Sequence, residues 1–243
     1  MSEELEGKGG GRPVRLDDEE GVTDIVADTV LSLWQIVNNL TRLRPSKKDR
    51  YRVTIFGSAR AKPGSKMYDE VKQLAASLSD LGCDIITGGG PGLMAAANEG
   101  AAQADLQGKT KSVGIRVDLP FEQENNPFVE QMFEHGTFFT RLHHFVIASD
   151  AFVVTPGGIG TVLETIMVWQ LLQVRHLHDT PLILIGDMWP GMLQWAEESM
   201  LPFDPPLADP KDLEIPDCVK DADAAIALIR DHHQKWIQEQ TDA

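Results

Sequence analysis

Apolar strand-like runs alternate with helix-like segments over residues 51–238, and this alternation constrains the fold more than any other feature of the sequence. The runs are apolar along their length rather than at every second position, and they occupy residues 51–56, 83–87, 111–117, 151–155 and 181–186. Such strands are typical of a parallel sheet that helices cover on both faces. The sequence therefore predicts an α/β fold with a doubly wound parallel sheet and helices on both faces.

The same pattern divides the chain into a tail, a helix and one domain. Residues 1–20 are charged and rich in glycine, so we expect a disordered tail. Apolar residues recur at helical spacing from Val22 to Leu40, which predicts an N-terminal helix within residues 21–45. We expect this helix to dock on the core, with an oligomer contact as the alternative. Residues 50–238 are expected to form a single α/β domain.

The composition indicates a soluble protein that does not bind polyanions. The 243 residues carry a formal net charge of −15, and an acidic surface disfavours nucleic-acid backbones and anionic membranes. No apolar run approaches the roughly 20 residues needed to span a bilayer, and the acidic N-terminus is unlike a signal peptide. Cys83 and Cys218 provide no disulfide framework. Together these features predict a cytoplasmic location.

Two glycine-rich turns follow two of the predicted strands. They occupy residues 87–94 and 155–161, and each leads into a helix-like segment. Glycines allow the backbone to approach a ligand closely, and the N-terminus of the following helix offers unpaired N–H groups and a positive dipole end. Because both turns belong to parallel strands, they are expected at the same edge of the sheet. The pair predicts a pocket for a phosphorylated ligand.

Side chains near these turns are candidates for binding and chemistry. The Thr161 hydroxyl, together with backbone N–H groups of the second turn, is suited to hold a phosphate. Glu164 follows one helical turn later, beside the expected ligand, although a first-turn acid that complements the helix dipole is an equal alternative. Arg141 is expected to open a helix over 141–149, where it would clamp phosphate or a ribose hydroxyl. A surface arginine is the alternative.

Other site classes fit the sequence less well. Residues 90–95 match the dinucleotide fingerprint, but they follow the second strand rather than the first, and Asp118 is a loosely placed acidic partner. The phosphate-binding loop of nucleoside triphosphatases is absent. A structural role is favoured over metal binding for six of the seven histidines, His143, His144, His176, His178, His232 and His233.

The glycine turns and their flanks resemble one protein family. Residues 88–94 are one residue tighter than the motif G-G-G-x-x-G-x-M, and residues 156–164 match P-G-G-x-G-T-x-x-E. Further matches lie at residues 56–60, 119–123 and 149–152. From about residue 51 to 235 the chain resembles the Lonely-guy family of cytokinin riboside 5′-monophosphate phosphoribohydrolases, long labelled "possible lysine decarboxylase".

The resemblance implies a Rossmann-like nucleotide-binding domain, usually in a homodimer with active sites near the interface. It implies that Arg141 and Glu164 are catalytic. It also implies that the 5′-phosphate is held by Gly157, Gly158, Gly160 and Thr161. The rest of the nucleotide site would be lined by Gly57, Ser58, Gly88, Gly89, Gly90 and Met94. No metal or organic cofactor is implied.

Three positions depart from the family pattern. Leu142 stands where the family commonly has lysine, Leu163 where an acidic residue often precedes the glutamate, and Ala95 where many members have glycine. The missing charge at Leu142 is expected to weaken phosphate binding or alter substrate choice.

The residues and the resemblance together predict hydrolysis of the N-glycosidic bond of a nucleoside 5′-monophosphate, either AMP or a cytokinin riboside monophosphate. The products would be free base and ribose 5-phosphate. A nucleotide-binding sensor or scaffold without turnover is the alternative, and a nicotinamide-dependent enzyme is a third hypothesis. Amino-acid decarboxylation needs a Schiff-base lysine, whereas Lys109 and Lys111 are expected at the opposite edge of the sheet.

Overall fold

The structure is a computed structural model that describes residues 14–15, 17–40, 49–105, 107–117 and 126–242. The chain forms two compact units, Met1–Ser46 and Lys47–Ala243. Within the described helices, none is long and apolar enough to cross a membrane.

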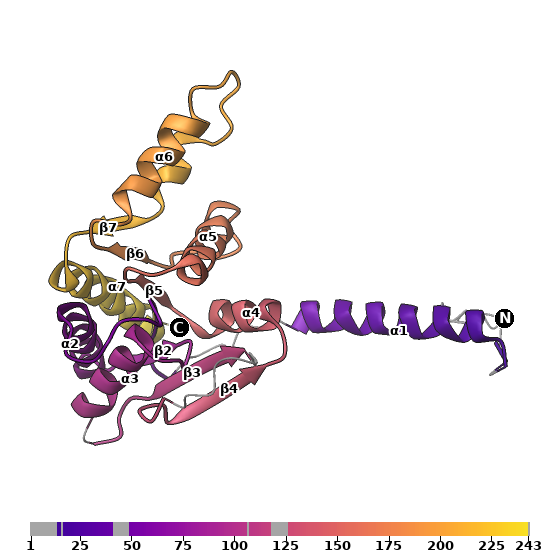
Figure 1. The fold of residues 1–243 in the computed structure, drawn as a ribbon, viewed down its shortest axis with the longest axis horizontal. Coiled ribbons are helices and arrows are strands. Elements are labelled where there is room, and N and C mark those ends of the chain that lie inside the picture. The colour runs from indigo at the N-terminus through magenta and orange to yellow at the C-terminus, as the bar shows by residue number, and fades with distance from the viewer. Residues whose placement is uncertain (1–13, 16, 41–48, 106, 118–125, 243) are drawn as a thin grey trace. The chain divides into compact units, whose positions relative to one another are not determined.

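The second unit is built on one parallel sheet (Figure 1). Its strands are β1 (Arg52–Phe56), β2 (Asp84–Thr87), β3 (Ser112–Val117), β4 (Gln131–His135), β5 (Ala151–Val154), β6 (Leu182–Ile185) and β7 (Asp217–Val219). Five of them coincide with the apolar runs of the sequence. The strands β4 and β7 were not predicted, because they are edge strands whose residues are exposed or only half-buried. The predicted α/β parallel sheet is confirmed.

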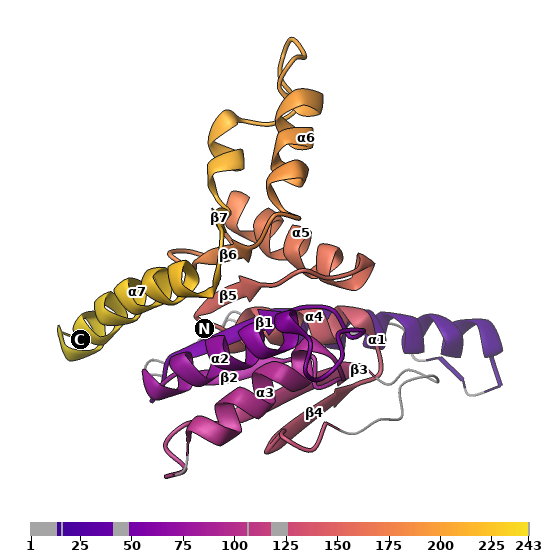
Figure 2. The ribbon, with the colours of Figure 1, turned by 60° about the vertical axis from the view of Figure 1, so that its left-hand side comes forward.

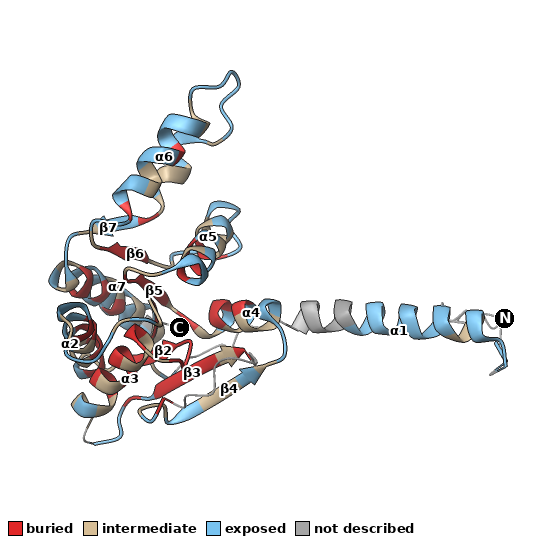
Figure 3. Ribbon diagram, in the orientation of Figure 1, coloured by how far each residue is buried: buried red, intermediate tan, exposed pale blue. Residues whose placement is uncertain are grey.

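Helices cover both faces of this sheet. They are α2 (Lys66–Asp80), α3 (Leu93–Ala104), α4 (Phe138–Ala148), α5 (Ile159–Gln173), α6 (Pro190–Met200) and α7 (Ala222–Asp242). The helices α2, α3 and α7 pack on one face, and α4 and α5 pack on the other (Figures 1 and 2). The strands are buried between these layers, whereas α6 and the residues between it and β7 extend outward and are largely exposed (Figure 3).

The order of the strands creates a reversal at the centre of the sheet. That order is β4-β3-β2-β1-β5-β6-β7, so the chain winds outward from β1 to β4 and then returns to place β5 beside β1. The register pairs Val53 with Ala151 and Phe56 with Val154. The loops after β1 and β5 therefore diverge to opposite faces, which opens a crevice at the carboxyl ends of these strands.

The helix α4 begins earlier than predicted. It starts at Phe138, after Thr137, whose hydroxyl accepts a hydrogen bond from the amide of Thr140 at 3.2 Å. Arg141 therefore lies at the fourth position of the helix and does not open it. The sequence hides this start because the run Phe138–Phe139 looks apolar rather than like a helix cap.

The first unit contains the helix α1 (Glu19–Leu40). Its start precedes residue 21, where the sequence predicted the helix to begin. Apolar side chains on it, such as Ile25, Val30 and Leu33, are 50–60% exposed. Most of the predicted tail, residues 1–13 and 16, lies outside the described residues, as do residues 41–48.

Candidate active site

A cavity of about 570 Å³ lies at the carboxyl ends of the strands, at the reversal between β1 and β5. We call it the carboxyl-edge cavity. Every predicted site residue lines it except Gly89 and Gly90. Those that do are Gly57, Ser58, Gly88, Met94, Arg141, Gly157, Gly158, Gly160, Thr161 and Glu164. Segments that are far apart in the sequence are thus brought to one place.

Backbone hydrogen bonds hold the three turns of this cavity together. The Ser58 amide donates to the carbonyl of Pro156 at 3.2 Å, and the Ser58 carbonyl accepts from the amide of Leu93 at 2.8 Å. The Thr155 amide and hydroxyl both donate to the carbonyl of Phe56. These hydrogen bonds therefore fix the turns after β1, β2 and β5 in position relative to one another.

The second glycine turn leads directly into the N-terminus of α5. Gly158 occupies the N-cap, and no side chain caps the helix there. The first N–H groups of a helix have no intrahelical partners, so this end is open to a ligand in the cavity. A Cβ at Gly157 would overlap the side chain of Thr161. Only glycine lets the buried Thr161 lie beneath the turn, where its hydroxyl supplements the free amides.

Arg141 and Glu164 form an ion pair at the floor of the cavity. The Arg141 Nη2 lies 3.3 Å from the Glu164 Oε1, and the two side chains are only 13% and 10% exposed. Arg141 Nε also donates to the carbonyl of Ile115 at 3.0 Å, and the guanidinium lies 5.2 Å from the centre of the Phe145 ring. The guanidinium is therefore fixed by α5, β3 and its own helix.

The carboxyl group of Glu164 has an altered acidity. Burial raises the pKa of Glu164 from 4.5 to about 7, and the nearby Arg141 charge offsets part of the rise. Near neutral pH the group is thus poised to accept or donate a proton. Glu164 is the sixth residue of α5 and is buried, so the alternative of a first-turn acid that complements the helix dipole does not hold.

The first glycine turn passes close to the Arg141–Glu164 ion pair. A Cβ at Gly88 would come within 2.6 Å of the Met94 sulfur and equally close to the Arg141 guanidinium. Gly89 and Gly90 do not reach the cavity lining. Gly89 instead packs against β4, close to Met132. The Gly90 carbonyl accepts a hydrogen bond from the side-chain amide of Asn126, in the loop before β4.

All three departures from the family pattern fall outside the cavity lining. Leu142 is 9% exposed and packs into the protein, so a missing charge there does not remove a group from the cavity wall. Leu163 is half-exposed on α5 and points away from the lining as well. The third departure, Ala95, follows Met94 without lining the cavity.

Some lining residues were missed by the sequence analysis. Arg60 adds a second cation, and Met188 reaches the cavity from the turn after β6. Exposed Phe138 and Ile159 stand at its rim, 46% and 87% exposed. Arg60 was visible as a cation in the turn directly after a predicted strand. The other three carry no local signal, because only the packing of α4, α5 and α6 brings them here.

Four of the histidines, His135, His144, His232 and His233, take part in packing and hydrogen bonding. His232 Nδ1 lies 2.7 Å from the Tyr51 hydroxyl, and His144 Nδ1 lies 2.9 Å from His135 Nε2. His233 is buried and its ring contacts that of Tyr51. Within the described part of the chain, no three His, Cys, Asp or Glu residues are grouped as metal ligands.

Comparison with known proteins identifies the family. The fold and the cavity first define the class, an α/β protein with a ligand crevice at the reversal of its parallel sheet. A family model described as "possible lysine decarboxylase" matches residues 94–229, more than half of the chain. The chain belongs to this family, the one whose Lonely-guy motifs it resembles. Comparison with curated proteins found no match.

Solved structures share the fold. The protein TM1055 is 21% identical, with a TM-score of 0.54 over 74% of this chain and 99% of that one. The molybdenum cofactor carrier protein of Chlamydomonas reinhardtii is 18% identical, with a TM-score of 0.57 over 75% and 98%. The molybdenum cofactor binding protein of Rippkaea orientalis is 19% identical, with a TM-score of 0.57 over 76% and 98%. These likenesses show the Rossmann-like fold alone.

Proposed function

We propose that the protein hydrolyses the N-glycosidic bond of a nucleoside 5′-monophosphate, which gives free base and ribose 5-phosphate. The observation that carries this proposal is the pairing of the uncapped N-terminus of α5 with the buried Arg141–Glu164 pair in one cavity. An anion-binding helix end and an ionisable carboxyl group one helical turn away suit a sugar phosphate whose reacting carbon lies beside the carboxyl group.

Binding of the phosphate supplies the positioning. The amides at the start of α5 and the Thr161 hydroxyl would hold the 5′-phosphate, and Arg60 adds positive charge to the cavity wall. A group held away from the bond that breaks contributes binding energy that fixes the sugar in place. Gly57, Ser58, Gly88 and Met94 would line the remainder of the nucleotide.

Glu164 is the candidate catalytic group. As the C1′–N bond breaks, its electron pair leaves with the base and positive charge develops on the ribose, which the carboxylate stabilises. The same carboxylate takes a proton from the attacking water, whose hydroxyl joins C1′. The departing base takes up one proton, so the sum consumes one water. Arg141 would orient the carboxylate and the ribose.

The family description as a decarboxylase finds no support in the cavity. Decarboxylation of an amino acid on pyridoxal phosphate requires a lysine for the Schiff base. Among the described residues that line the carboxyl-edge cavity, none is a lysine. Lys111 instead stands at the amino ends of the strands.

We further propose that the protein is a homodimer in the cytoplasm and that a second copy covers α4 and α5. Both helices carry exposed apolar residues, namely Phe138, Phe139, Ile147, Ile159, Leu163 and Ile166. Large apolar groups gathered on one surface mark interaction sites. Phe138 and Ile159 also line the cavity, so a partner seated there would help to enclose the substrate.

The test is chromatography of AMP and isopentenyladenosine monophosphate after incubation with the purified protein. Wild type is expected to release free base, and Glu164→Gln is expected to lower kcat by roughly 10²–10⁴-fold, the usual contribution of a general base. Glu239→Gln, an exposed glutamate on α7, is the matched control and should retain full activity.

The remaining outcomes discriminate between function classes. If either nucleotide binds and no base is released, the protein is a nucleotide-binding sensor or scaffold rather than a hydrolase. If neither binds, the proposal of a nucleotide site is wrong.

A further inference from the structure

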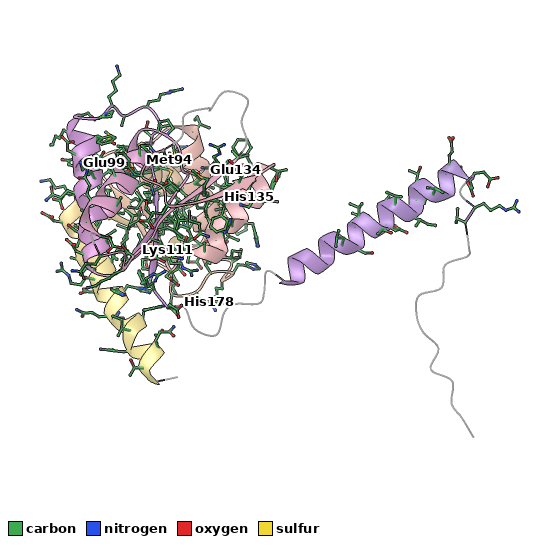
Figure 4. All side chains as sticks on the ribbon, turned by 90° about the horizontal axis from the view of Figure 1, so that it is seen from below. Met94, Glu99, Lys111, Glu134, His135 and His178 are labelled. Atoms are coloured by element: carbon green, nitrogen blue, oxygen red, sulfur yellow. The ribbon has the colours of Figure 1, made fainter. Side chains whose placement is uncertain are left out.

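A second cavity lies at the opposite edge of the sheet. Its volume is about 310 Å³, and it is bounded by the amino ends of β1 to β4 and by the last turns of α4. We call it the amino-edge cavity. Figure 4 shows Met94 of the carboxyl-edge cavity and Lys111 of the amino-edge cavity well apart across the core. The two cavities share no lining residue, although strands of the sheet and the helix α4 contribute residues to both.

The amino-edge cavity concentrates positive charge in an acidic protein. Arg50, Arg52 and Lys111 line it, against one carboxylate, Asp84. The whole chain has 22 basic and 37 acidic residues. The three cations and one acid of this cavity therefore give it the opposite sign of charge from the chain as a whole. Asp150 lies nearby and its carboxylate accepts from the Arg52 amide at 3.0 Å, which still leaves a local excess of positive charge.

The buried carboxylate of Asp84 forms a close side-chain ion pair with only one of these three cations. Asp84 is almost fully buried and pairs with Arg50 Nε at 2.6 Å, while Arg52 Nε is more distant, at 3.9 Å. Lys111 reaches Asp84 through its main-chain amide, at 2.9 Å. Any residue could supply that amide, so the lysine side chain is not needed for it. Both arginine side chains remain about one-third exposed and can donate further hydrogen bonds.

The opposite wall of the cavity is apolar. Its apolar residues are Ile86, Val113, Ile115, Phe133 and Ala148, and the polar side chains of His144 and Gln131 complete the lining. A basic rim over an apolar wall is the usual arrangement of a small-molecule site, where a few polar groups orient a ligand and apolar groups contact its body. A lone inorganic ion would leave this wall unused.

We propose that the amino-edge cavity binds a small organic anion whose phosphate or carboxylate group is held by Arg52 and Lys111. The apolar body of the ligand rests against Val113 and Phe133. This site is separate from the carboxyl-edge cavity and does not depend on the function proposed for it. Because α4 carries Arg141 in its first half and His144 in its second half, one helix borders both sites.

The test follows the ring signals of His144 by NMR while phenyl phosphate or inorganic phosphate is added. The His144 signals, identified with His144→Gln, report binding beside Lys111 and not at Thr161. Phenyl phosphate is expected to shift them saturably and to bind more tightly than inorganic phosphate. Lys111→Gln should weaken phenyl phosphate binding by about fivefold, the scale of one partly exposed charge contact.

Lys109→Gln is the matched control. It removes the same charge two residues earlier, at an exposed lysine outside the cavity, and should leave the affinity unchanged. Arg52→Gln provides a second variant that should weaken binding as Lys111→Gln does. The proposal is overturned if His144 shows no saturable shift, or if Lys111→Gln and Lys109→Gln bind equally. Equal affinity for both probes would overturn the role of the apolar wall.

Discussion

The Arg141–Glu164 pair is the residue-scale feature on which the candidate site depends. The sequence allowed a surface arginine and a helix-dipole acid as alternatives, and each residue by itself was ambiguous. Packing decides the matter, because both side chains are buried and lie 3.3 Å apart. Burial costs a carboxylate more than a neutral acid, and this cost is the origin of the raised pKa of Glu164.

The raised pKa of Glu164 makes stability depend on pH. In the unfolded chain the carboxyl group titrates near 4.5, and in the folded protein near 7. Between these values the folded state binds more protons, so wild-type stability falls as pH rises through this window and then levels off. Glu164→Gln carries no titrating group and should be the more stable protein at pH 8, by at most about 3 kcal/mol.

Denaturant unfolding at several pH values checks this prediction. The difference between Glu164→Gln and wild type should shrink to nothing as the pH falls below 4.5. The exposed Glu239→Gln should show no such trend. A difference that stays constant across the pH range would contradict the assignment of burial as the cause.

At the scale of elements, the cap at the N-terminus of α4 helps to position Arg141, a residue of the candidate active site. The Thr137 hydroxyl caps this helix, and the Arg141 amide donates to the Thr137 carbonyl at 3.2 Å. Ser65 caps α2 in the same way, through the amide of Tyr68, but no residue of that turn lines the carboxyl-edge cavity. The two caps thus form a matched pair.

Thr137→Ala and Ser65→Ala are each expected to lower the free energy of unfolding by about 1 kcal/mol, the usual value of an N-cap. Only Thr137→Ala should also lower kcat/KM, because fraying of the first turn of α4 displaces Arg141 from Glu164. Thermal unfolding and steady-state kinetics on both variants check this. Equal activity of the two variants would mean that Arg141 is held by its contacts with Ile115 and Glu164 alone.

The elements themselves were predictable to different degrees. The strands β1, β2, β3, β5 and β6 are central, so their apolar runs identified them. The edge strands β4 and β7 are short and have no continuous apolar run, because each is covered less completely. Their pairing with β3 and β6 comes from backbone hydrogen bonds, which leave no pattern in the side chains.

At the scale of the whole molecule, the exposed apolar residues of α4 and α5 predict self-association. Leu163→Asp places a charge among the exposed apolar residues of α5 and should convert the proposed dimer to a monomer, since an unpaired charge is costly to bury in an interface. Ile237→Asp is the control, because Ile237 is 47% exposed on α7 and Leu163 is 49% exposed. Light scattering after size-exclusion chromatography measures both.

If Leu163→Asp keeps the mass of the wild type, the proposed interface is wrong. If wild type is itself a monomer, the exposed apolar surface has another role. In the expected case the monomer should also lose activity, because Phe138 and Ile159 would no longer be covered at the rim of the cavity.

The amino-acid sequence alone was enough to predict the fold class and the two glycine turns, and its resemblance to family motifs identified most residues around the carboxyl-edge cavity. It could do so because these features are local: strand apolarity, glycine at turns and the helix that follows are read from neighbouring residues. Contacts between distant segments depend on the tertiary structure. It paired Arg141 with Glu164, excluded Gly89, Gly90 and Leu142 from the cavity, added Arg60, and gathered three cations at the other edge of the sheet. Burial and charge proximity depend on packing across the sheet, and no local pattern of residues records them.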